Sequence, residues 1–191
     1  MTSKYFLMPI FCAFIAFNSL AQKHTIGERF GGCVVFWVDS TGQHGLIASK
    51  ADQSNEIKSY NGKYKRIDDG ISDGVGAGAK KTAVIIGAML QDNPKGTFAA
   101  KICADYKVTD SLGVTYSDWY LPCIDELNLL QLQKDVVGGF NDYYYGCYWS
   151  SSEQDEARAF TRFISGQSKN DDRTRGRDKM LTYHVRAIRA F

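Results

Sequence analysis

The sequence predicts a single domain of the α+β class, in which strands and helices occupy separate stretches of the chain. Three observations support this class. The run Cys33–Val38 is rich in β-branched and aromatic residues and is followed, after a turn, by a second short apolar run, as in a β-hairpin. Residues 80–91 and 98–106 instead repeat apolar residues at helical spacing. Apolar runs typical of strands return from residue 148 onward.

The first 21 residues are predicted to be a secretory signal peptide. Lys4 supplies a positive charge, and the 13 residues of Tyr5–Phe17 are mostly apolar. The segment Ser19-Leu20-Ala21 places small residues where a signal peptidase needs them, so cleavage is expected before Gln22. The apolar run is shorter than the roughly 18–20 residues that a membrane span requires. We therefore expect an exported protein, either periplasmic, surface-located or secreted, with residues 22–191 as its mature domain and no membrane span after cleavage.

The charge of the mature chain is nearly balanced. Of the 23 basic residues only Lys4 lies in the leader, so 22 basic side chains face 21 acidic ones. No global field would draw such a chain to nucleic acid or to a membrane surface. Any binding of anions must therefore come from a local patch, and no nucleic-acid partner is expected.

The N-terminal half of the mature chain is expected to begin with the hairpin. A strand at residues 33–38 is followed by a turn at 39–42 and a second strand at 45–49. Residues 50–78 are polar and rich in Gly and Asp, which indicates a long loop. Loops of this length in compact domains are usually functional or mobile.

Three helices are expected in the middle of the chain. The first covers residues 80–91. Thr97 is the predicted N-cap of the second, at 98–106. The residue before Pro122 should be extended, because proline disfavours the helical region for its predecessor, and the third helix should begin near Ile124.

The C-terminal part is expected to return to strands. Residues 148–151 and 157–164 have strand-like composition. Residues 166–180 are polar and charged and are predicted to form a loop, and residues 181–191 a last strand.

A family resemblance is strongest in three short segments. They are Asp118-Trp-Tyr-Leu-Pro-Cys-Ile-Asp-Glu-Leu127, Tyr148-Trp-Ser-Ser-Ser-Glu153 and His184-Val-Arg-Ala-Ile-Arg-Ala-Phe191. As a set they resemble the DUF1566 family, also called the Lcl C-terminal domain family after the collagen-like adhesins that end in it. The resemblance covers most of residues 27–191. It implies a C-type-lectin-like fold with short antiparallel strands, two to three helices, long loops, and N- and C-terminal strands that lie adjacent.

The resemblance leaves several functions open, because this fold hosts adhesins, ligand-binding proteins and the distantly related formylglycine-generating oxidases, and fold does not choose among them. The leading hypothesis is a secreted or surface-exposed, non-catalytic binding module for a glycan or other polyanion, since adhesins of the family are associated with sulfated polysaccharides. One alternative is a structural domain that binds a protein partner in the cell envelope. The other is an oxidase-like enzyme, for which Cys123 and Cys147 are the candidate reactive residues.

The cysteines allow a disulfide prediction. An even number in the exported part permits two bridges with three connectivities, or alternatively buried free thiols; these four residues are Cys33, Cys103, Cys123 and Cys147. We expect Cys123 to pair with Cys147, because both flank the motif segments. Many members of the family have Ser, a better helix cap, where this chain has Cys123, which also suggests a bridging role.

Two polar segments are candidates for ligand binding. In 169–179, three arginines are spaced by two, so an extended chain would project them on one side, and guanidinium groups suit sulfate, phosphate and carboxylate. The segment 141–145 offers aromatic faces beside hydroxyls, which suits sugars. The alternative is a solvated charged loop beside a tyrosine-rich strand end. The candidate ligand-binding residues are Lys169, Arg173, Arg175, Arg177, Lys179, Tyr143, Tyr144 and Tyr145.

Metal, nucleotide and nucleophile motifs are not matched. The glycines of 74–82 depart from phosphate-loop spacing. The acidic segment 68–73 lacks the EF-hand spacing and the Glu-Pro-Asn or Gln-Pro-Asp tripeptide of calcium-dependent lectins, so calcium is not expected to change stability. The three histidines lack zinc-type spacing, and His24, near the mature terminus, is expected to be disordered. We therefore expect no metal, no cofactor and no catalytic residue.

The motif tryptophans are expected to be structural. Trp119 and Trp149 could stack on sugars, but their place in the motifs favours packing in the core, with each indole N–H bonded internally.

Overall fold

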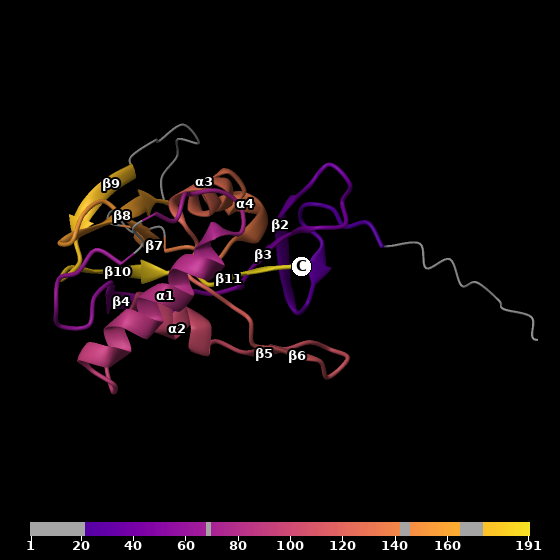
Figure 1. Ribbon diagram of the computed structural model, residues 1–191. Helices are drawn as coiled ribbons and strands as arrows, with labels where there is room; N and C mark the ends of the chain where they lie inside the picture. Colours follow the sequence, from indigo (N-terminus) through magenta and orange to yellow (C-terminus); the bar gives the residue numbers. More distant parts are fainter. Residues whose placement is uncertain (1–21, 68–69, 142–145, 165–173) are drawn as a thin grey trace, which may run out of the picture.

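The computed structural model describes residues 22–67, 70–141, 146–164 and 174–191. Within these ranges the chain forms a four-stranded, a five-stranded and a two-stranded sheet together with helices, so the predicted α+β class is confirmed. Figure 1 shows the five-stranded sheet at one end and the β2–β3 hairpin at the other. The signal-peptide prediction lies outside the described residues.

The first sheet contains the predicted hairpin. Its strands are β1 (Arg29–Phe30), β2 (Cys33–Val38), β3 (Gly45–Ala48) and β11 (Ile188–Ala190), in the order β1-β2-β3-β11, and every pairing is antiparallel. The apolar composition of β2 and β3 has a direct cause, because the whole of β3 and most of β2 are buried.

The second sheet has the order β4-β10-β7-β8-β9. Its strands are β4 (Ser54–Lys58), β10 (Thr182–Val185), β7 (Cys147–Glu153), β8 (Arg158–Phe163) and β9 (Thr174–Asp178). Only β10 and β7 run parallel, through the single pair His184↔Tyr148. The two edge strands β4 and β9 lie where loops were predicted, so that prediction is wrong there. Both are polar because an edge strand with exposed side chains needs no apolar alternation.

Four helices lie between the strands within the described residues: α1 (Ala77–Asp92), α2 (Ala99–Asp105), α3 (Ile124–Leu132) and the short α4 (Lys134–Val137). Figure 1 shows α1 beside α2, and α3 beside α4. The β5–β6 hairpin (Val108–Thr109 and Thr115–Tyr116) projects after α2. The predicted cap of the second helix is wrong. Its N-cap is Phe98, which is fully buried and makes no side-chain capping bond, because core packing fixes this helix start.

The two ends of the domain meet, although not as predicted. The last strand, β11, pairs with β3 and not with the first strands, so the N- and C-terminal strands share one sheet without being neighbours. The Phe191 ring instead contacts His24, at 4.8 Å between ring centroids, and Phe30, at 5.1 Å. His24 is buried and its Nδ1 lies 3.0 Å from a Glu28 oxygen, so the expectation that it is disordered is wrong.

Both motif tryptophans are structural, as predicted. Trp119 and Trp149 are almost fully buried. The indole N–H of Trp119 donates to the Tyr116 carbonyl at 3.1 Å, and that of Trp149 donates to the Ile57 carbonyl at 2.8 Å. Neither ring is available to a ligand.

Candidate functional site

The three motif segments meet inside the domain. Tyr120 and Ile188 exchange backbone hydrogen bonds of 2.9 and 3.1 Å, and the Ser151 N–H donates to the Pro122 carbonyl at 2.8 Å. Residues far apart in the sequence thus form one framework, and their polar side chains turn inward.

Glu126 joins the starts of two helices. Its buried carboxylate accepts from the Gly76 N–H at 2.8 Å, from the Tyr120 hydroxyl at 3.0 Å and from the Cys123 N–H at 2.9 Å. Burial raises the pKa of Glu126, and these hydrogen bonds oppose that rise. A Cβ at Gly78 would collide with the Glu126 carboxylate, which explains a glycine inside α1. The positive end of α1 is therefore already occupied by a protein carboxylate.

Ser152 and Lys81 form a second internal contact. Ser152 Oγ accepts from the Ile124 N–H at 2.9 Å, lies 3.4 Å from Lys81 Nζ and donates to Asp73. Lys81 Nζ also pairs with the Asp73 carboxylate at 2.9 Å. A serine beside a lysine can be a nucleophile and base, but here the proton and lone pairs of the hydroxyl are all engaged and the residue is buried. The pair is structural.

Lys179 belongs to the same interior. Its Nζ lies 2.5 Å from Glu153 Oε1 and donates to the Lys65 carbonyl at 2.6 Å, while the Ile67 N–H donates to Glu153 Oε2 at 2.5 Å. The Lys179 side chain is fully buried. The prediction that it contacts a ligand is wrong, because this ammonium is committed to holding the 65–67 segment against the sheet.

Two of the other candidates lie in the described residues. Arg175 and Arg177 sit on β9, two residues apart as predicted; Arg175 is exposed and Arg177 is half-buried. The other candidates lie outside the described residues: Lys169, Arg173, Tyr143, Tyr144 and Tyr145. Whether any of them contacts a ligand therefore stays a prediction.

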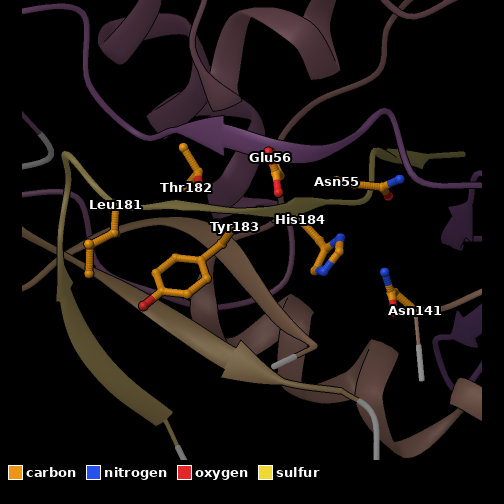
Figure 2. A pocket seen from close by; sticks show the side chains of 7 residues that line it. All are labelled: Asn55, Glu56, Asn141, Leu181, Thr182, Tyr183 and His184. Carbon is orange, nitrogen blue, oxygen red and sulfur yellow. The ribbon is translucent and has the colours of Figure 1, made fainter. Parts of the chain in front are cut away.

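A pocket of about 510 Å³ lies along β4 and β10. Figure 2 shows its side chains, with Tyr183 and His184 extending from β10 on the side where Asn141 lies. The lining residues are Asn55, Glu56, Asn141, Leu181, Thr182, Tyr183 and His184.

A β-bulge shapes this pocket. The register passes from Tyr183↔Ile57 to Val185↔Ser54, so β4 carries one residue more than β10 between these pairs. Asn55 and Glu56 together oppose the single residue His184. Bulges re-aim side chains and are frequent beside functional sites. Here the bulge places an amide and a carboxylate, both exposed, opposite His184 in the lining of one pocket.

His184 is the buried polar group of the pocket. It is 9 % exposed and its ring lies 5.1 Å from that of Tyr148. Its Nδ1 has no hydrogen-bond partner among the described residues, and the nearest carboxylate oxygen, on Asp52, is 3.9 Å away. Asp52 is already engaged by the Tyr148 hydroxyl at 2.8 Å and by Arg186 Nε at 2.6 Å. Burial lowers the pKa of His184, with Asp52 opposing, so the imidazole is neutral at pH 7.

The other polar groups of the pocket are available. The side chains of Asn55, Glu56, Thr182 and Tyr183 make no hydrogen bond to the described part of the chain. The Tyr183 ring is held edge-on against Trp149 at 5.0 Å. The arrangement offers amide, carboxylate, hydroxyl and imidazole groups beside an aromatic ring, which suits binding of a hydroxyl-bearing molecule.

Sequence reasoning found little of this pocket. Only Asn141 falls in a segment that was singled out for ligand binding, and His184 begins a motif segment that was singled out only for its family resemblance. Asn55 and Glu56 lay in a predicted loop, and His184 was set aside because it lacks zinc-type spacing. A bulge has no sequence signature here, since it depends on pairing with a strand more than 120 residues away.

The predicted disulfide between Cys123 and Cys147 is wrong, because no disulfide joins any of the four cysteines of residues 22–191. Cys123 follows Pro122, whose carbonyl accepts a hydrogen bond from the Ser151 N–H, so Cys123 lies near Ser151. Cys147 lies four residues before Ser151 on β7. That separation is about 13 Å in an extended strand, beyond the reach of a disulfide.

Cys123 also lacks the reactivity that an oxidase would need. Its thiol donates to the Gly74 carbonyl at 3.2 Å, and burial raises its pKa to about 12. Burial likewise raises the pKa of Cys33 and of Cys103. The oxidase alternative required a low-pKa thiolate with a nearby second cysteine, and Cys123 provides neither.

Metal sites and membrane spans were also sought. The described residues contain no group of three or more His, Cys, Asp or Glu side chains arranged to hold a metal ion. In the same ranges, no helix combines the length and the apolar character that crossing a membrane requires.

Comparison with known proteins adds little. No family model matches the chain, and no curated protein matches it significantly. Among solved structures, the chain is similar to a fimbrial protein from Bacteroides ovatus ATCC 8483, with 16% identity over 82% of this chain and a TM-score of 0.48. The match covers 36% of that protein, so the chain spans about a third of its length. A likeness at this level assigns neither fold nor function.

Proposed function

We propose that this protein is an exported, non-catalytic binding module that takes a glycan in the pocket along β4 and β10. The observation that carries the proposal is a set of side chains around the bulge that make no hydrogen bond to the described residues, at Asn55, Glu56, Thr182 and Tyr183. Elsewhere in the described residues, buried charged groups such as Glu153 and Lys179 are engaged with each other. Polar groups left open in a shaped hollow are what a ligand site requires.

A sugar fits this chemistry. Its hydroxyls both donate and accept, so they can bond to the Asn55 amide, the Glu56 carboxylate and the Thr182 hydroxyl together. Its apolar C–H face can lie against an aromatic ring or the exposed Leu181 side chain. The pocket is open to solvent on the strand edge, which suits part of a longer chain.

The family and its fold also belong to this proposal. We infer a C-type-lectin-like domain related to the DUF1566 / Lcl C-terminal group, supported by the joint packing of the three motif segments at Tyr120, Pro122, Ser151 and Ile188. Export is supported by the signal-like segment 1–21. The motif residues would then be the shared framework, and the pocket would be particular to this chain.

The test is binding of residues 22–191 to an immobilised glycan panel. The double variant Asn55→Ala/Glu56→Ala changes two exposed side chains without hydrogen bonds of their own, so it should fold normally. We expect it to lose at least about tenfold in affinity, the equivalent of roughly 1.4 kcal/mol. Glu156→Ala, an exposed acidic residue near the start of β8, is the matched control and should bind as the parent does. Binding that the double variant retains would place the site elsewhere, and a panel with no ligand at all would remove the proposal.

A further inference from the structure

The charge of the pocket points to a narrower class of ligand. Among the described residues that line it, Glu56 is the charged one at neutral pH, and none is Lys or Arg. The imidazole of His184 stays neutral because it is buried. An anionic group entering the pocket would meet a carboxylate and no counter-charge.

The nearest cations are committed or lie outside the pocket. Arg186 is fully buried and donates to Asp52, to the Ser49 carbonyl at 2.9 Å and to the Gly139 carbonyl at 2.5 Å. Its guanidinium also lies over the Phe140 ring at 4.1 Å. Lys58 pairs across the strands with Thr182 but is not part of the pocket lining. The arginines on β9 do not line it either.

We infer that the ligand of this pocket is an uncharged saccharide, and that Glu56 sets this specificity. The inference rests on the proposed glycan function and goes against the sulfated ligands that the family resemblance implies. The exposed carboxylate accepts hydrogen bonds from neighbouring sugar hydroxyls and repels a sulfate or uronate at the same position. Specificity of this kind combines an attractive contact with a repulsive one.

The imidazole Nδ1 of His184, which has no hydrogen-bond partner in the described part of the chain, supports the same class. A buried polar atom without a partner is uncommon and is normally satisfied by water or ligand. A neutral imidazole has one donor and one acceptor nitrogen, and a hydroxyl can pair with either. A sulfate can only accept, so it could satisfy at most the donor nitrogen.

The experiment uses polysaccharides that share a backbone and differ in charge. Dextran is compared with dextran sulfate, and galactan and mannan are each compared with a sulfated form, with residues 22–191 in a salt series. We expect the uncharged member of at least one pair to bind, with little dependence on salt. Glu56→Gln removes the charge and keeps the shape, so it should shift the preference toward the charged member by about tenfold or more, whereas Glu156→Gln should leave the preference unchanged.

The outcomes separate the two proposals. Binding of sulfated members alone, weakened by salt and lost in Arg175→Ala/Arg177→Ala, would overturn the uncharged-saccharide inference and leave a glycan-binding module. A preference that Glu56→Gln does not move would overturn the role of Glu56. Absence of binding to every polymer would remove the proposed function itself. Melting curves of each variant check that the comparison is between folded proteins.

Discussion

The buried ion pair between Lys179 and Glu153 gives the strongest quantitative prediction. Both side chains are at most 3% exposed and their charged atoms lie 2.5 Å apart. Replacing Lys179 with Met removes the ammonium from the buried Glu153 carboxylate, which still accepts a hydrogen bond from the Ile67 N–H. Removing one member of such a pair costs about 3–5 kcal/mol. In a domain of this size that corresponds to a fall in melting temperature of roughly 10 °C.

The assay is urea and thermal unfolding of residues 22–191, followed by a double-mutant cycle. Adding Glu153→Gln to Lys179→Met removes the second charge, so the double variant should regain part of the lost stability. Lys63→Ala, which breaks the exposed contact with Asp92 at 3.2 Å, is the control and should change little. A loss below about 1 kcal/mol for Lys179→Met would refute the reasoning. So would a loss of glycan binding at unchanged stability, which is what a ligand-contacting lysine predicts.

Three further predictions concern His184, Cys123 and the glycines of α1. Burial lowers the pKa of His184 in the folded protein, so its neutral form stabilises the fold above about pH 6.5. That stabilisation is lost as the pH falls through the lowered pKa of the folded state. The urea midpoints at pH 7.5 and pH 5.5 should therefore differ more in the parent than in His184→Asn. Cys123→Ser should leave the free energy of unfolding unchanged or raise it by up to about 1 kcal/mol. Thiol titration of the native parent should label the partly exposed Cys147 first. If neither Cys123 nor Cys147 reacted even in the unfolded protein, the disulfide prediction would be restored. In α1, a Cβ at Gly87 would meet open space, so Gly87→Ala should stabilise the protein by about 0.5–1 kcal/mol. A Cβ at Gly78 would collide with Glu126, so Gly78→Ala should destabilise it. Equal effects of the two substitutions in calorimetry would contradict this difference in packing.

Periodicity predicted those elements that bury one face. The β2–β3 hairpin and the helices α1, α2 and α3 lie within a few residues of the predicted bounds, since their apolar residues follow the period of the element. The edge strands were missed because neither β4 nor β9 buries an apolar face. Local pattern cannot show that a polar segment pairs with a strand from the other end of the chain.

Distances between side chains could not be predicted from the sequence either, because they also depend on pairing between distant segments. Cys123 and Cys147 flank the motifs in sequence, but the pairing of Pro122 with Ser151 sets them apart along β7. Lys179 belongs to a run of exposed-looking charges, and only the fold shows that this one turns inward toward Glu153. Charge spacing identifies a candidate patch, whereas burial decides which of its members can meet a ligand.

The division between framework and pocket also explains why a recognisable motif said so little about function. The most distinctive polar residues of the motifs hydrogen-bond to other parts of the domain; these residues are Glu126, Ser152 and Glu153. A side chain with every donor and acceptor engaged contributes to the fold and has nothing left for a ligand. Specificity must therefore come from positions where hydrogen-bonding capacity is left over, and in the described part of the chain Asn55 and Glu56 at the bulge are such positions. Exchanging these two residues should change what is bound without changing the fold.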